Sequence, residues 1–164
     1  MKTVYIVRHA KSSWDNFDVS DHDRTLMQIG ISKTRKIIDF FKKNKVVSDI
    51  IICSTAVRAH DTAKLIADGI SYDIEGIVKS KSLYHADTDD IYSELFALNN
   101  KINTAMIIAH NPTLTDFVNN YVNPPINNLP TTGVMSISFN TNSWEKIANA
   151  KFKINFVVFP RMLS

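Results

Sequence analysis

A run of four apolar residues, Val4-Tyr5-Ile6-Val7, stops abruptly at the pair Arg8-His9. Such a run is typical of a strand buried in a sheet that is covered on both faces. Burying an unpaired charge is costly, so the strand cannot continue cheaply through Arg8. In open α/β sheets, ligands bind at the carboxyl ends of the strands. We therefore expect this strand to deliver Arg8 and His9 to a site, although a solvated strand end would give the same pattern.

Five more segments have the composition of strands, and stretches with helical spacing separate most of them. The expected strands are residues 4–7, 49–53, 75–79, 104–109, 134–139 and 152–159. The last two are expected to pair as a hairpin through residues 140–142. Because strands alternate with helices, the chain is predicted to have an α/β fold, a three-layer α/β/α sandwich with a mainly parallel central sheet.

The expected helices have recognisable starts and ends. They cover residues 25–43, a segment from Ser54 to about Gly69, a segment around residues 91–98, and a segment that opens after residue 110. Thr25 and Gln28 have the spacing of a capping box. Asn111 and Pro112 suit the N-cap and the first position of the last helix.

Composition limits the class of protein. The 164 residues suffice for a single domain, 1–164, with a sizeable core. The net charge of +3 is mild and no basic block is interleaved with aromatic residues, so nucleic acid is not an expected partner. No apolar run approaches the ~20 residues of a membrane span, and the three residues before the first strand are too short for a signal peptide. One cysteine, Cys53, allows no intramolecular disulfide and fits a reducing, cytoplasmic compartment.

Three of the expected strands end at residues that suit one kind of ligand. These residues are Arg8 and His9 after the first strand, Ser54 and then Arg58 after the second, and His110 after the strand at 104–109. Parallel strands place their carboxyl ends at one edge, so two His and two Arg should converge there with no carboxylate. Arginine binds phosphate through its planar fork of donors, and helix N-termini favour an anion. The sequence therefore predicts an anion site.

Four ordered motifs resemble those of the histidine phosphatase superfamily, also called the phosphoglycerate mutase-like fold. They are Val7-Arg8-His9-Ala10-Lys11-Ser12-Ser13-Trp14, Asp23-Arg24-x-Leu26-x-x-x-Gly30, Cys53-Ser54-x-Ala56-x-Arg58-Ala59-x-x-Thr62-Ala63 and Ala109-His110-Asn111-Pro112-Thr113-Leu114. Ala109 departs from the family, which more often has Gly there. The small size and the form of the first motif are most similar to the SixA-like branch, named for a phosphohistidine phosphatase.

The resemblance implies a metal-independent phosphatase. His9, neutral, would attack phosphorus and become a phosphohistidine that water then hydrolyses. Arg8, Arg58 and His110 would bind the phosphoryl oxygens and stabilise the charge of the transition state. No cofactor is implied. The five histidines show no paired ligand spacing and the single cysteine has no partner, so no metal is expected.

Other residues near these motifs have open roles. Lys11 and Ser12 are candidates for phosphate binding, and with Trp14 they either edge the cleft or belong to an ordinary loop. Many relatives carry an Asp or Glu after the third sheet segment that protonates the leaving group. Here His85 and Asp87 are the candidates for this general acid, but the simpler interpretation is that Asp87 or Thr88 caps the next helix.

The lack of a clear acid bears on the substrate. It would hinder hydrolysis of an alkyl phosphate more than that of a phosphoramidate, whose P–N bond is labile. This favours phosphohistidine on a signalling protein over a glycolytic mutase reaction. The alternatives are a small-molecule phosphomonoesterase of the same superfamily and a phosphate-recognising module without turnover. The intact His9 favours an enzyme, because a pure binder needs no nucleophile; the oligomeric state is not specified.

Overall fold

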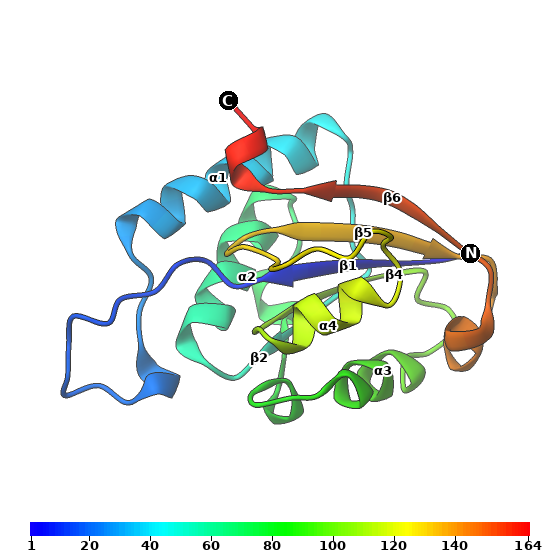
Figure 1. The fold of residues 1–164 in the computed structure, drawn as a ribbon, viewed down its shortest axis with the longest axis horizontal. Helices are drawn as coiled ribbons and strands as arrows, with labels where there is room; N and C mark the ends of the chain where they lie inside the picture. The colour runs from blue at the N-terminus through cyan, green and yellow to red at the C-terminus, as the bar shows by residue number, and fades with distance from the viewer.

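The structure, a computed structural model, describes residues 1–164, and its six strands form one sheet (Figure 1). The strands are β1 Lys2–Arg8, β2 Ile50–Ser54, β3 Val78–Ser80, β4 Thr104–Ala109, β5 Val134–Phe139 and β6 Phe152–Val158. Their order across the sheet is β3-β2-β4-β1-β5-β6. The first four pair in parallel, whereas β5 pairs antiparallel with both β1 and β6. The prediction of a mainly parallel sheet is confirmed.

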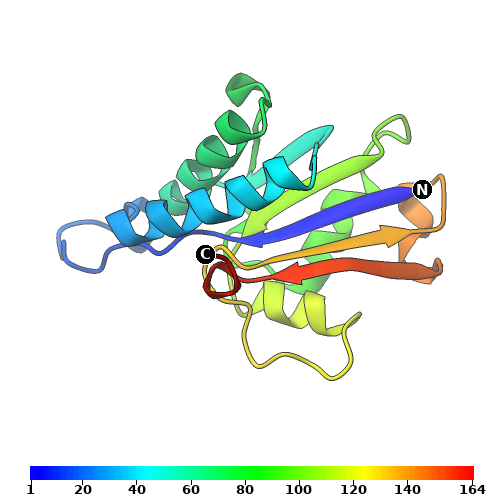
Figure 2. The ribbon, with the colours of Figure 1, turned by 90° about the horizontal axis from the view of Figure 1, so that it is seen from above.

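Helices cover both faces of the sheet. They are α1 Gln28–Lys43, α2 Val57–Gly69, α3 Thr88–Phe96 and α4 Thr113–Asn119. Short 3-10 turns are η1 Asp21–Asp23, η2 Ile74–Gly76, η3 Lys81–Leu83, η4 Trp144–Asn149 and η5 Pro160–Met162. Figure 2 shows α1 and α2 on one side of the sheet and α4 on the other. None of the helices is both long enough and apolar enough to cross a membrane.

Alternation along the strands divides the core in two. Successive side chains of a strand point to opposite faces, so Tyr5 and Val7 pack with the apolar side chains of α1 and α2. Val4 and Ile6 pack instead with those of α3 and α4. Because both faces are covered, β1 reads as a continuous apolar run. The predicted three-layer α/β/α sandwich is therefore confirmed.

The first helix starts later than the sequence predicts. The expected capping box of Thr25 and Gln28 is wrong: α1 begins at Gln28, and its N-cap, Met27, makes no side-chain cap. The reason is that residues 25–27 run alongside the segment after β1. Thr25 O accepts a hydrogen bond from Ser13 N at 2.8 Å, and Met27 N donates to Lys11 O at 2.9 Å. The backbone of this segment is thus engaged outside the helix.

Two other helix starts also differ. Ser54 belongs to β2, and α2 begins only at Val57. Pro112 is the N-cap of α4 rather than its first residue. The carboxamide of Asn111 still accepts a hydrogen bond from Thr115 N at 3.1 Å, so it satisfies a backbone donor of the first turn.

The pairing of the last two strands is confirmed, but their connection is not a tight hairpin. It contains η4, whose Trp144 is fully buried. The Trp144 indole N–H donates to Ile102 O at 2.8 Å. A buried aromatic in the connection folds it back against the end of the sheet, which the polar residues at 140–142 did not indicate.

Candidate active site

The carboxyl ends of β1 and β4 meet at the centre of the sheet. The register pairs Arg8, the last residue of β1, with Ala109, the last residue of β4. His9 N donates to Ala109 O at 3.1 Å. The rings of His9 and His110, which follow the two strands, consequently lie with their centroids 5.0 Å apart. Strand register alone brings these two histidines together.

The chain holds His9 in one tautomer. The residue is 7% exposed, and its Nδ1 lies 2.7 Å from Ala10 O. A carbonyl oxygen only accepts hydrogen bonds, so Nδ1 carries the proton and Nε2 keeps its lone pair. The pKa of His9 is lowered to about 4, chiefly because burial disfavours the charged ring and also because nearby arginines repel it. The ring is therefore neutral at neutral pH, with Nε2 available as a nucleophile.

His110 is half-buried and is also held in its neutral form. Its Nε2 lies 2.7 Å from Ser54 Oγ at the end of β2. The same hydroxyl accepts the Ala56 N–H at 3.2 Å, so its own proton can be donated to Nε2, which leaves the ring proton on Nδ1. That Nδ1 is buried and has no partner in the protein. Burial, followed by the effects of His9 and Arg58, lowers the pKa of His110 to about 3.

Arg58, in the first turn of α2, is held by a residue that the sequence did not single out. Its Nη1 donates to Asp21 O at 2.7 Å and its Nη2 to Asp21 Oδ2 at 3.2 Å. The Tyr84 hydroxyl donates to the same Oδ2 at 2.6 Å, and Arg24 Nε donates to Oδ1 at 3.2 Å. The Tyr84 hydrogen bond first, and the arginine charges after it, lower the pKa of Asp21 to about 2. Asp21 is thus a fixed carboxylate that orients two guanidinium groups.

A cavity of about 530 Å³ lies over these strand ends. Both histidines line it, together with basic side chains and no Asp or Glu; the basic residues are Arg8, Lys11, Arg24, Lys33 and Arg58. The Arg8 guanidinium is fixed by a hydrogen bond from Nη1 to Leu129 O at 3.1 Å. The Nε atoms of Arg8 and Arg58 are buried and unpartnered. An excess of cationic donors with spare hydrogen-bonding capacity suits an oxyanion.

The predicted site residues fall into two groups. Arg8, His9, Arg58 and His110 all line this one cavity, as do Lys11 and Ser12, of which Lys11 is exposed and Ser12 buried. Trp14 lies beneath Arg24, whose guanidinium carbon is 3.4 Å from the ring centroid. The general-acid candidates, His85 and Asp87, do not line this cavity.

A smaller hollow of about 180 Å³ adjoins the cavity, because Arg58 and His110 line both. His85 lines the smaller hollow, and Asp87 lines neither. The Asp87 carboxylate instead accepts Asp90 N at 3.0 Å and caps α3 in a capping box. Of the two candidates, only His85 lies beside the strand-end residues.

The residues that sequence reasoning missed are Asp21 and Tyr84. Both stand in segments that read as polar loops, and neither belongs to a periodic pattern. Their hydrogen bonds join positions 37 and 63 residues apart in the chain. Only the neighbouring Asp23-Arg24 motif gave a signal that this loop belongs to the site. No group of three or more His, Cys, Asp or Glu side chains is placed to hold a metal ion.

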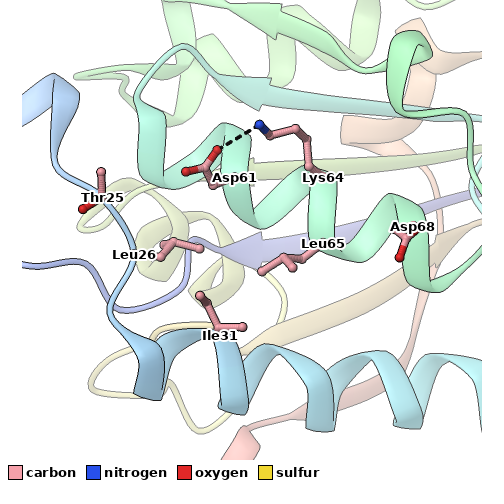
Figure 3. A pocket seen from close by; sticks show the side chains of 7 residues that line it. All are labelled: Thr25, Leu26, Ile31, Asp61, Lys64, Leu65 and Asp68. Atoms are coloured by element: carbon pink, nitrogen blue, oxygen red, sulfur yellow. Dashed lines mark ion pairs between the residues drawn. The ribbon is translucent and has the colours of Figure 1, made fainter.

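A separate hollow of about 470 Å³ lies between α1 and α2 (Figure 3). Its floor is formed by Leu26, Ile31 and Leu65, and Lys64 and Asp61 form an ion pair of 3.2 Å at its side. No strand-end residue reaches it. The chemistry of the site therefore belongs to the cavity over β1 and β4.

The comparison with protein families decides the assignment. Residues 4–79, which contain Arg8, His9 and Arg58, match the model of the histidine phosphatase superfamily (branch 1). The comparison assigns this part of the chain to the histidine phosphatase superfamily. The match supports a phosphatase, which is a hydrolase. An uncharacterized protein of Mycobacterium leprae is 31% identical over 112 residues, a match that covers 66% of each chain.

Solved structures agree in fold. The protein histidine phosphatase SixA, solved with tungstate, has a TM-score of 0.82 at 22% identity, with 99% of each chain covered. A phosphoserine phosphatase from Entamoeba histolytica, solved as a mutant with phosphoserine, has a TM-score of 0.63 at 14% identity over the whole of both chains. The fold of this protein is thus SixA-like and phosphoglycerate mutase-like.

Proposed function

We propose that this protein is a metal-independent phosphatase that forms a phosphohistidine intermediate on His9 and acts on phosphohistidine in proteins. The observation that carries the proposal is the state of His9. Ala10 O fixes the Nδ1–H tautomer at 2.7 Å, and the pKa lowered to about 4 keeps the ring neutral. A neutral imidazole with a free Nε2 in a cationic cavity is an activated nucleophile. A module that only binds phosphate has no use for one.

The proposed reaction has two steps. His9 Nε2 attacks phosphorus, the bond from phosphorus to the leaving group breaks, and the leaving group takes up a proton from solvent water. Water then attacks the phosphorus of phospho-His9, which releases inorganic phosphate and restores the neutral ring. Arg8, Arg58 and His110 Nδ1 supply donors for the three phosphoryl oxygens, where charge must be stabilised. The positive charge that the reaction needs is thereby supplied by side chains.

The preference for phosphohistidine follows from the leaving group. No Asp or Glu lines either hollow around His9 and His110, and the pKa of about 2 keeps Asp21 from donating a proton. An imidazole leaving group has a conjugate acid of pKa about 6.5, far below that of an alcohol. It can therefore leave with little help from the enzyme. The solved SixA, which is a protein histidine phosphatase and binds the oxyanion tungstate, supports the same class of substrate.

A cytoplasmic location is part of this proposal. Cys53 is a buried free thiol and burial raises its pKa to about 12. An unreactive core thiol is compatible with a reducing compartment.

The test of the mechanism is trapping of the intermediate. The wild-type protein mixed with a phosphohistidine protein should yield an acid-labile phosphoryl group on His9, detected by mass spectrometry under alkaline conditions. His9→Ala should lose both the intermediate and turnover while it keeps the wild-type circular dichroism spectrum. His60→Ala, which removes a histidine of α2 outside the cavity, serves as the control. Wild-type turnover by His9→Ala would remove His9 from the nucleophilic role.

The test of the substrate class is the dependence of rate on leaving-group pKa. We expect a steep dependence, since general-acid help is typically worth roughly 10²–10⁴-fold and matters most for poor leaving groups. Asp87→Ala should leave the dependence unchanged, because this carboxylate caps α3. If Asp87→Ala or His85→Ala selectively abolished alkyl phosphate hydrolysis, that residue would be the acid, and a small-molecule phosphomonoesterase would be the better assignment.

A further inference from the structure

The catalytic cavity continues beyond the strand ends as a groove. Two more hollows, of about 100 and 460 Å³, adjoin it in succession. Lys33 and Pro130 belong to the walls of both the cavity and the first of these hollows. Phe159 and Arg161 belong to the walls of both hollows. The three spaces therefore form one groove that runs from the end of β1, past the loop at 125–131, to η5.

The charge along this groove has one sign. Besides the strand-end arginines, its exposed basic side chains are Lys11, Lys33 and Arg161, and none of these three pairs with a carboxylate. No Asp or Glu lines any part of the groove. The whole chain has 16 acidic residues against 19 basic ones. The excess of positive charge along the groove is thus a local feature, because the chain as a whole has nearly equal numbers of acidic and basic residues.

The groove is longer than a small phosphate ester requires. The cavity over β1 and β4 already lies within the range of small-ligand sites, roughly 300–1,000 Å³. The far hollow has an apolar wall that includes Ile126 and Phe159. Arg161 stacks on Phe159, with its guanidinium carbon 4.8 Å from the ring centroid. An apolar wall with cations at its edge suits an extended polypeptide that carries acidic side chains.

We propose that this groove binds an acidic stretch of the substrate polypeptide, next to its phosphorylated residue. The inference rests on the proposed function, because it takes the cavity around His9 as the place of the phosphoryl group. Lys33 and Arg161 then face the acidic side chains of the substrate. Complementary charges of this kind govern association rate and specificity more than affinity.

The experiment compares two phosphohistidine peptides of equal length, one flanked by Asp and Glu and the other by Asn and Gln. p-Nitrophenyl phosphate, which occupies only the cavity around His9, reports the basal activity. We expect the wild type to hydrolyse the acidic peptide with a kcat/KM about 10-fold higher at low salt, a difference that salt screening reduces. Arg161→Gln should lower that preference about 3-fold, as removal of an exposed ion pair does, and leave p-nitrophenyl phosphate hydrolysis unchanged. Lys33→Gln should also lower it.

Charge-matched controls lie on α1 and on β6, the strand before η5. Lys43→Gln removes an exposed cation about 15 Å along α1 from Lys33, and Lys153→Gln removes one on β6, outside the groove. Both should keep the wild-type preference. If Arg161→Gln and Lys33→Gln also kept the preference for the acidic peptide, the groove would not bind the acidic stretch. The proposed function would be unaffected by that result. A small phosphate ester that also carries a carboxylate tests the occupant. If Arg161→Gln lowered kcat/KM for this ester as much as for the acidic peptide, the polypeptide would be the wrong occupant.

A binding measurement separates the two proposals. Fluorescence anisotropy of the unphosphorylated acidic peptide needs no turnover. If the wild type hydrolysed no phosphorylated substrate but bound this peptide in an Arg161-dependent manner, the proposed function would fail and the groove would be supported. Equal binding of the acidic and amide peptides would overturn the groove.

Discussion

Two neutral histidines at the strand ends contribute to the response of this protein to acid. The pKa of His9 is lowered to about 4 and that of His110 to about 3, both from an ordinary value of 6.5. Below pH 6.5 the unfolded chain takes up protons on these rings that the folded protein does not. The free energy of unfolding therefore falls as the pH falls from 6.5 toward 4. About one pH unit above 6.5 both rings are almost entirely neutral in both states, and the effect vanishes.

We predict a measurable slope in urea unfolding between about pH 6.5 and about pH 5, before most carboxylates titrate. Each histidine should contribute roughly 1 kcal/mol per pH unit in this window. His110→Asn should make the slope shallower, whereas His60→Asn, at a partly exposed position, should change it less. A slope unaffected by His110→Asn would mean that folding does not lower the pKa of this ring.

Asp21 carries a second prediction at the residue scale. Asp21→Asn removes the carboxylate that Arg58, Arg24 and Tyr84 share. A charge-assisted hydrogen bond is worth about 1.5–3 kcal/mol, so kcat/KM for p-nitrophenyl phosphate should fall roughly 10–100-fold, with weaker inhibition by tungstate. Asp23→Asn changes the same charge two residues away, at an exposed position, and should keep most of the activity. Equal losses in the two variants would show a general effect of charge rather than orientation of Arg58.

At the scale of elements, the position of α1 depends on the absence of a side chain at Gly30. A Cβ on Gly30 would lie 2.9 Å from Lys11 N and closer still to Lys11 O. The obstacle is backbone, so it cannot move aside as a side chain would. The same Lys11 O accepts the Met27 N–H just before the helix. The helix and the segment that follows His9 are therefore in direct backbone contact, which explains why the Asp23 to Gly30 motif ends on glycine.

We expect Gly30→Ala to lower the free energy of unfolding by about 1–3 kcal/mol, as overpacking does, and to lower kcat, because the segment after His9 must shift. Gly76→Ala is the control, since its Cβ would meet only the flexible side chain of Tyr72 at 3.3 Å. Chemical denaturation and p-nitrophenyl phosphate turnover measure the two effects. An unchanged kcat in Gly30→Ala would show that the packing of α1 against Lys11 does not affect catalysis at the site.

At the scale of the whole molecule, the mechanism draws its positive charge from side chains of several elements. Turnover should therefore persist in excess chelator, with kcat within about 2-fold of its value in untreated protein, a difference worth less than 0.5 kcal/mol. The protein is assayed after dialysis against the chelator and again after each divalent cation is restored. A loss that one cation reverses would contradict the metal-independent mechanism.

The sequence predicts the layers and the strand ends because both depend on local composition. Apolar runs that stop at Arg8 and His110 mark where strands leave the core. Parallel pairing of β1 and β4 then brings these strand ends together. The support of Arg58 could not be predicted, since Asp21 and Tyr84 meet it only through the packing of loops that carry no periodic signal. The predicted start of α1 is wrong for a related reason. The backbone of Thr25 is hydrogen-bonded to Ser13, a partner that no local sequence rule reveals, and Thr25 therefore stays outside the helix.

Strand β4 lies between β1 and β2 in the sheet, although it follows both in the chain. While the protein is being synthesised, a ribosome-bound chain that ends before residue 104 already contains Arg8, His9 and Arg58 but no strand to align them. Under the proposed mechanism, such a nascent chain is expected to be catalytically silent. It can become competent only after β4 has emerged and inserted between β1 and β2, so the first turnover has to follow assembly of the centre of the sheet.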